Sequence, residues 1–133
     1  MTVTINAVAS TGLVQTSDGS GVVKLQSNGV TTNALAWVRF DGTTSPGTIK
    51  SQYNVSSVTK NGTGDFTVNF TNALTDANYS VIGSAGLTSG TGNRSVVTAF
   101  YSPSTTAVSV TTVVSSTIGS TDANMTSVAI FGN

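Results

Sequence analysis

The chain contains no cysteine, no histidine and no glutamate, and its only charged side chains are five Lys or Arg and five Asp among 133 residues. Without cysteine there is no disulfide framework, which is one common source of stability in small secreted domains. Without histidine and cysteine the commonest transition-metal ligands are missing, so only aspartate and main-chain carbonyls are left for a hard cation. We therefore expect neither a metal nor another cofactor.

Charge is scarce as well. Charged residues make up 8% of the chain and the formal net charge is zero. A protein that follows a phosphate backbone needs clustered cations, so nucleic acid is not an expected partner. The N-terminus from Met1 to Asn6 lacks the basic region and apolar core of a signal peptide. No run approaches the roughly 18 apolar residues of a membrane helix. We expect a chain that is complete from Met1, made in the cytoplasm and not inserted in a membrane.

The residues that are present favour strands. Valine-rich apolar positions, part of a 38% apolar fraction, alternate with Ser, Thr and Asn, and no window longer than ten residues keeps helical spacing. Turn signals every eight to twelve residues are typical of an antiparallel β-sandwich, and we predict an all-β, jelly-roll-like sandwich over residues 35–133. The expected strands lie at 36–41, 48–53, 79–84, 94–102, 107–114 and 125–132, together with one central hairpin.

That hairpin has the clearest pattern. Its arms alternate apolar and polar residues around Asn61-Gly62-Thr63-Gly64, where Asn and Gly tolerate the positive φ of a tight turn. Positions in phase with the strands give the predicted core: Val38, Phe40, Tyr53, Val58, Phe66, Val68, Phe70, Tyr79, Val81, Val97, Phe100, Val108, Val110, Val128 and Ile130.

The first 34 residues form a weaker β region. Short strands are expected at 3–8, 12–16 and 21–26. They bury too few apolar side chains for an isolated sheet, so they must pack on another chain or on the rest of this one. Residues 1–34 are therefore expected to need a partner surface.

Catalytic chemistry would depend on aspartate alone. Turns and strand ends, where these residues occur, are places where Asp commonly bonds its own local backbone. Two aspartates could in principle form a glycosidase site, but the local structural role is the favoured interpretation. We predict that the protein is not an enzyme and that none of these residues is catalytic: Asp18, Asp41, Asp65, Asp76 and Asp122.

Aromatic residues and one loop are the candidates for recognition. A flat ring suits the apolar side of a sugar, but Tyr53 and Tyr79 are in phase with their strands and are predicted to be core. Trp37 is out of phase with its neighbours, so it either faces a subunit interface or lies exposed. The glycine-rich loop after Gly86 is either a recognition surface or a neutral structural loop. The predicted receptor-binding residues are Ser89, Thr91, Asn93, Arg94 and Tyr101.

Two segments resemble bacteriophage sequences. Residues 11–34, TGLVQTSDGSGVVKLQSNGVTTNA, are similar to the N-terminal portions of fibre-like proteins of tailed phages, particularly those of cyanobacterial and other aquatic hosts. Residues 35–85, with AWVRFDG at 36–42 and NGTGDFTVNF at 61–70, resemble a recurrent fibre-tip domain. The resemblance implies a homotrimer on the virion, assembled in the host cytoplasm. Residues 1–34 would be its attachment and trimerisation segment, and the C-terminal sandwich would face outward.

The resulting prediction is a structural virion protein: a tail fibre or receptor-binding tip that contacts a host-surface glycan or protein. Its N-terminal segment would bind other phage proteins of the tail or capsid. The main alternative is a capsid decoration or cement protein that stabilises the shell. A free carbohydrate-binding module and a small depolymerase are two further readings.

Overall fold

The computed structural model describes residues 25–27, 30–87, 96–114 and 119–132, and this part of the chain contains strands and no helix. The strands are β1 (Gln26–Ser27), β2 (Val30–Thr31), β3 (Ala36–Asp41), β4 (Thr48–Tyr53), β5 (Val55–Gly62), β6 (Asp65–Phe70), β7 (Ser80–Gly86), β8 (Val96–Tyr101), β9 (Ala107–Val114), β10 (Gly119–Ser120) and β11 (Met125–Phe131).

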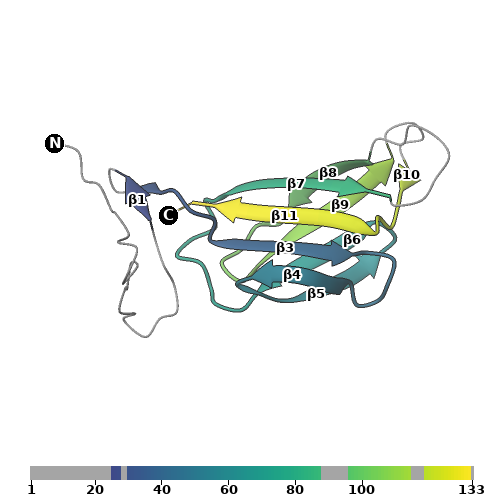
Figure 1. Cartoon of the computed structure of the whole chain (residues 1–133), viewed down its shortest axis with the longest axis horizontal. Coiled ribbons are helices and arrows are strands. Elements are labelled where there is room, and N and C mark those ends of the chain that lie inside the picture. The colour runs from purple at the N-terminus through teal and green to yellow at the C-terminus, as the bar shows by residue number, and fades with distance from the viewer. Residues whose placement is uncertain (1–24, 28–29, 88–95, 115–118, 133) are drawn as a thin grey trace, which may run out of the picture.

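One antiparallel sheet contains every strand except β1 and β2, which pair with each other. Its order is β4-β3-β11-β7-β8-β9-β6-β5, and β10 adds to β9. The sheet curls back on itself, so that β3 and β11 lie in front of β6 and β9 (Figure 1). The all-β antiparallel prediction is confirmed, and the two layers belong to one nearly closed, barrel-shaped sheet.

The seam of the barrel lies between β4 and β5, which are the two edges of the sheet and are joined by Asn54 alone. Asn54 has a φ of 54°, a left-handed conformation that asparagine tolerates better than most residues. Its side-chain amide donates to the carbonyls of Leu35 and Asn72, each at 3.2 Å, and its Oδ1 accepts from the Asn72 N–H at 2.8 Å. One side chain thus fixes the turn from the front layer to the back layer.

The core fills the space between the layers. Phe40 of β3 and Phe66 of β6 are fully buried and meet edge to face, with ring centroids 5.2 Å apart. Alternate residues of β3, β6, β9 and β11 surround this pair, as strand periodicity requires. The buried cluster consists of Ala36, Val38, Phe40, Val55, Val58, Phe66, Val68, Phe70, Val108, Val110, Val128 and Ile130.

Most of the predicted core is confirmed, and two residues in it are wrong. Val97 is 52% exposed, because β8 turns its even-numbered residues, including Phe100, toward the core. Tyr53 is only half-buried and is paired with Trp37, whose side chain points outward, so it also belongs to the outer face. Tyr79 does pack against the core, edge to face with Phe70.

The central hairpin forms as predicted, from β5 and β6, but its turn differs in detail. The positive φ falls at Gly64 (66°) and at neither Asn61 nor Gly62. A Cβ at Gly64 would lie 2.6 to 2.8 Å from backbone atoms of Thr112 and Thr121. The glycine is required by close packing as well as by backbone conformation.

The hairpin is also tied to the distant end of the chain. Asp122 accepts from the Gly64 N–H at 2.8 Å and from Lys60 Nζ at 2.6 Å, and Lys60 donates to the Gly42 carbonyl at 3.1 Å as well. Burial tends to raise the pKa of Asp122, but the hydrogen bonds from Lys60 and Gly64 outweigh it and lower the pKa below its usual value. Asp122 is therefore a charged structural clamp.

The predicted N-terminal strands at 3–8 and 12–16, and most of that at 21–26, lie outside the described residues. The β1–β2 pair is located at the end of the barrel where β3 begins and β11 ends (Figure 1). The Leu35 N–H donates to the Ile130 carbonyl at 2.8 Å at this end. Residues 1–34 as an attachment segment remain a prediction.

Candidate functional site

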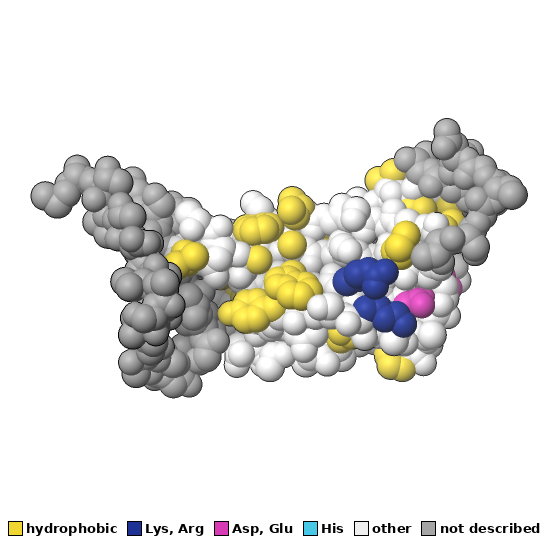
Figure 2. Space-filling model, in the orientation of Figure 1, with side chains coloured by type: hydrophobic (Ala, Val, Ile, Leu, Met, Phe, Trp, Pro, Cys, Tyr) yellow, Lys and Arg dark blue, Asp and Glu magenta, His cyan; other side chains and the backbone are white. Residues whose placement is uncertain are grey.

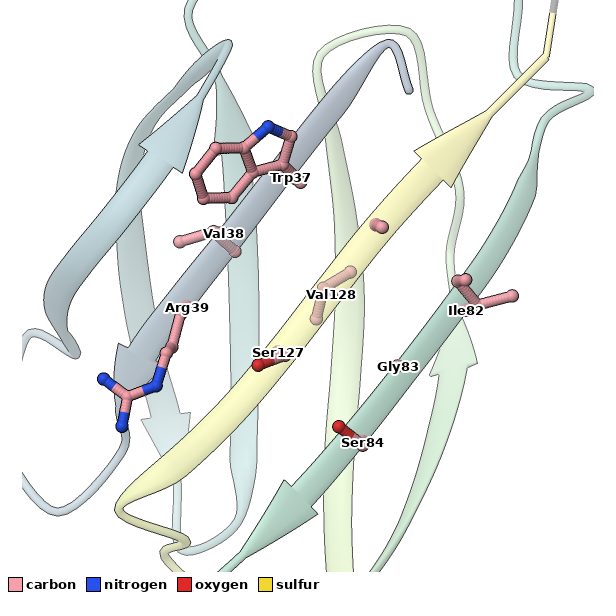
Figure 3. Close-up of a pocket in the computed structure, with 9 residues that line it drawn as sticks. Trp37, Val38, Arg39, Ile82, Gly83, Ser84, Ser127 and Val128 are labelled. Carbon is pink, nitrogen blue, oxygen red and sulfur yellow. The ribbon is translucent and has the colours of Figure 1, made fainter. Parts of the chain in front are cut away.

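A groove of about 500 Å³ crosses the outer face of three neighbouring strands, β3, β11 and β7 (Figure 3). We call it the Trp37 groove. Its volume is within the roughly 300–1,000 Å³ range of small-molecule sites. It is lined by Trp37, Val38, Arg39, Ile82, Gly83, Ser84, Ser127, Val128 and Ala129.

Strand register explains why a groove forms here. Ala129 of β11 is paired with Trp37 on one side and with Ile82 on the other. One step along the strands, Ser127 is paired with Arg39 and with Ser84. The middle strand therefore supplies a floor of small side chains between larger ones, and Figure 3 shows Trp37 and Ile82 on the flanking strands. Cross-strand partners point to the same face, so each row forms one continuous strip.

The first row is apolar and open to solvent. Trp37 is 37% exposed and Ile82 is 58% exposed, and the row extends onto β4 through the Trp37–Tyr53 pair. Figure 2 shows large hydrophobic side chains gathered on this face of the barrel. Both readings of Trp37, a subunit interface and free exposure, require this outward orientation of the side chain.

The second row is polar and carries positive charge. Arg39 lies exposed beside the groove, and a bulge between Arg39 and Phe40 places Lys50 in the neighbouring part of β4. Figure 2 shows cationic side chains next to the apolar ones, with an acidic side chain beside them. Among the described residues the one ion pair within 4 Å is Lys60–Asp122, so the Arg39 guanidinium is not paired with a carboxylate at that distance.

Asp41, the acidic residue at the end of β3, accepts hydrogen bonds from its own loop. Its Oδ1 accepts from the Thr43 hydroxyl at 2.6 Å and from the Thr43 N–H at 3.0 Å. These two hydrogen bonds are the main reason that the pKa of Asp41 is lowered, and the charges of Lys50 and Arg39 act in the same direction. Asp41 therefore stays ionised and caps its loop, as the sequence predicts.

The predicted receptor-binding residues fall elsewhere. Ser89, Thr91, Asn93 and Arg94 lie outside the described residues. Tyr101 is described and is 42% exposed, but its hydroxyl donates to Asp65 Oδ1 at 2.5 Å on the outer face of the back layer. This hydrogen bond is the main cause of its raised pKa, with burial and the Asp65 charge adding to it. Tyr101 does not line the Trp37 groove.

Two further aspartates within the described residues have hydrogen-bond partners. Asp76 accepts from the Asn78 N–H at 2.6 Å, which confirms the local-turn prediction. For Asp65 that prediction is wrong, because its partners are the side chains of Tyr101 and Asn61. Asp18 lies outside the described residues. Within the described ranges no group of three or more Asp residues is arranged to hold a metal ion.

The sequence indicates Trp37 as a candidate binding residue, but it does not indicate Ile82 or Ala129. The out-of-phase position of Trp37 was the signal that could be read. Ile82 and Ala129 belong to strands that are distant in the chain, and their register with Trp37 is set by tertiary pairing. No local pattern brings these three residues together.

Comparison with protein-family models, with curated proteins and with solved structures finds no match to this chain. No helix in the described ranges is long and apolar enough to cross a membrane. Any functional conclusion therefore depends on the groove and on the sequence itself.

Proposed function

We propose that this chain is a non-enzymatic virion protein of a tailed phage, a fibre or receptor-binding tip, and that it attaches to the host surface through the Trp37 groove. The observation that carries the proposal is the row of solvent-exposed Trp37 and Ile82, extended by half-buried Tyr53, on a rigid sheet. Exposed apolar patches on a small domain are disfavoured in water unless they serve as binding surfaces.

The sheet suits such a role because it holds the groove without loops. Trp37, Arg39 and Ala129 are each paired with a strand on both sides, so little conformational entropy is lost when a ligand binds. In the same proposal residues 35–133 are a jelly-roll-like head, and residues 1–34 attach it as a homotrimer to other virion proteins. The β1–β2 pair consists of two residues per strand, and so short a two-stranded pair is marginal on its own, which supports packing against a partner.

Cell binding tests the role of the groove. Labelled protein is expected to bind bacteria that the phage infects, and Trp37→Ala should weaken this binding at least tenfold, because buried aromatics dominate binding energy at interfaces. Thr59→Ala, on the outer face of the back layer, is the control and should bind normally. Full binding by the Trp37→Ala protein would refute the groove as the attachment site.

Location on the particle tests the class of virion protein. Antibody labelling of intact virions should place the protein at the tail. Signal spread over the head would instead favour a capsid decoration or cement protein. Absence from purified virions would exclude both roles.

A further inference from the structure

We infer that the ligand of the Trp37 groove is an acidic sugar residue, whose ring stacks on Trp37 and Tyr53 and whose carboxylate binds Arg39. This inference rests on the proposed attachment function and names the chemistry of what is attached. It follows from the size of the groove, the aromatic surface beside it and the charge at its polar row.

Two aromatic side chains lie on the β3–β4 side of the groove. Trp37 and Tyr53 are directly paired on β3 and β4, so their Cβ atoms are about 5 Å apart and both side chains lie on the outer face of the sheet. Both rings are amphipathic, with an apolar face and a polar N–H or O–H that suits a ligand rich in hydroxyls. A wholly apolar ligand would leave these polar groups without a role.

The floor and far wall limit what fits. Ala129 and Ser127 keep the space between β3 and β7 open, and the two outer strands are about 10 Å apart at the usual strand spacing. Ile82 closes the apolar row, and the hydroxyls of Ser84 and Ser127 line the polar row. A single ring-sized ligand with one apolar side and one hydrogen-bonding side matches this division.

The charge decides the class of sugar. Arg39 is two residues from Trp37 on the same face of β3, a separation of about 7 Å along the strand. A carboxylate carried on a ring that covers Trp37 would be within reach of its guanidinium. Arginine binds carboxylates through two parallel hydrogen bonds. Lys50 adds positive charge nearby, and Asp41 is engaged by Thr43.

The experiment measures the affinity of the full chain by calorimetry for oligomers of galacturonate, mannuronate and N-acetylneuraminate. Each is compared with its carboxyl-reduced form, which differs only in carrying CH₂OH in place of the carboxylate. At least one acidic oligomer should bind about tenfold or more tightly than its reduced form. That preference should shrink at high salt, because an exposed ion pair is screened.

Three variants separate the contributions. Arg39→Gln should abolish the preference for the acidic form and leave the affinity for the reduced form unchanged. Trp37→Ala should weaken both by about tenfold or more. Tyr101→Phe, an aromatic change on the outer face of the back layer, should alter neither. Circular dichroism and thermal melts confirm that each variant is folded.

The contrary outcomes are distinct. If none of the three acidic oligomers binds more tightly than its reduced form, the inference is wrong, even where cells still bind through Trp37. If Trp37→Ala lowers the oligomeric state in sedimentation, the groove is an interface between copies of this chain, and the inference is again wrong. If wild-type protein binds neither cells nor any sugar, the proposed function fails together with it.

Discussion

The two outer faces of the barrel differ in whether their side chains form hydrogen bonds within the protein. On the back layer, Asn69 donates to the hydroxyls of Ser57 and Thr59, each at 3.1 Å, and Asn61 donates to Thr67 at 3.0 Å. On the front layer, the strip across β4, β3, β11 and β7 consists of Tyr53, Trp37, Ala129 and Ile82. The β5–β6 part of the back layer is thus a hydrogen-bonded polar surface, although Val97 and Tyr101 of β8 are also exposed on that layer. The front strip is apolar across four strands.

This difference indicates where a ligand gains most. A ligand on the β5–β6 surface would have to replace hydrogen bonds that the protein already makes, for a small net gain in free energy. Covering the apolar strip removes nonpolar area from water at about 25 cal/mol per Å². We therefore expect back-layer changes to alter stability and groove changes to alter binding.

The largest expected effect is on the free energy of unfolding, with cell binding unchanged. Gly64→Ala should lower the free energy of unfolding by about 3 kcal/mol, because alanine is strained at a φ of 66° and its Cβ would meet Thr112 and Thr121. Gly62→Ala is the matched control, since no atom lies within 4 Å of its added Cβ. Urea denaturation measures both. If folded Gly64→Ala protein binds cells more weakly, stability and cell binding do not depend on separate parts of the barrel.

Filling the groove should weaken cell binding and leave the stability nearly unchanged. Ala129→Leu places a large side chain between Trp37 and Ile82 and should weaken cell binding about tenfold. Because the residue points outward, the free energy of unfolding should change by less than about 0.5 kcal/mol. Thr59→Leu adds similar bulk to the back layer and should not affect binding. Equal losses for both variants would mean that attachment is not specific to the groove.

The polar layer itself can be weakened. Asn69→Ala removes the donor that joins Ser57 to Thr59 and should cost about 1 kcal/mol of stability, with cell affinity unchanged. Thermal melts at neutral pH give the comparison. A neutral result would show that these hydroxyls are equally well satisfied by water.

Acid should weaken the clamp under the hairpin. The folded-state pKa of Asp122 is lowered, so the stability it provides is present above its unfolded pKa of about 3.9 and is lost as the pH falls through the folded value. Unfolding measured between pH 6 and pH 2 should show this loss. In Asp122→Asn the decline should be shallower, and what remains should include Asp41, whose pKa is lowered by Thr43. An unchanged slope in Asp122→Asn would contradict the clamp.

Local sequence patterns predict the strands well and the assembled surface poorly. The strands at 36–41, 48–53 and 107–114 have the predicted bounds, because alternation and turn residues act over a few positions. Val97 was misassigned although Phe100 had already fixed the inward phase of β8, so this error could have been avoided. The Trp37–Ala129–Ile82 row, by contrast, depends on pairing between distant strands, which no local pattern specifies.

The seam at Asn54 has a consequence for how copies of this chain behave together. Edge strands offer unpaired backbone groups to other molecules and so promote aggregation, and a chain with zero net charge has little repulsion to prevent it. Here the two edges, β4 and β5, face each other, and the Gly47 N–H donates to the Val58 carbonyl across the gap at 3.0 Å. Closing the sheet on itself therefore protects a neutral protein from strand-to-strand polymerisation at high local concentration.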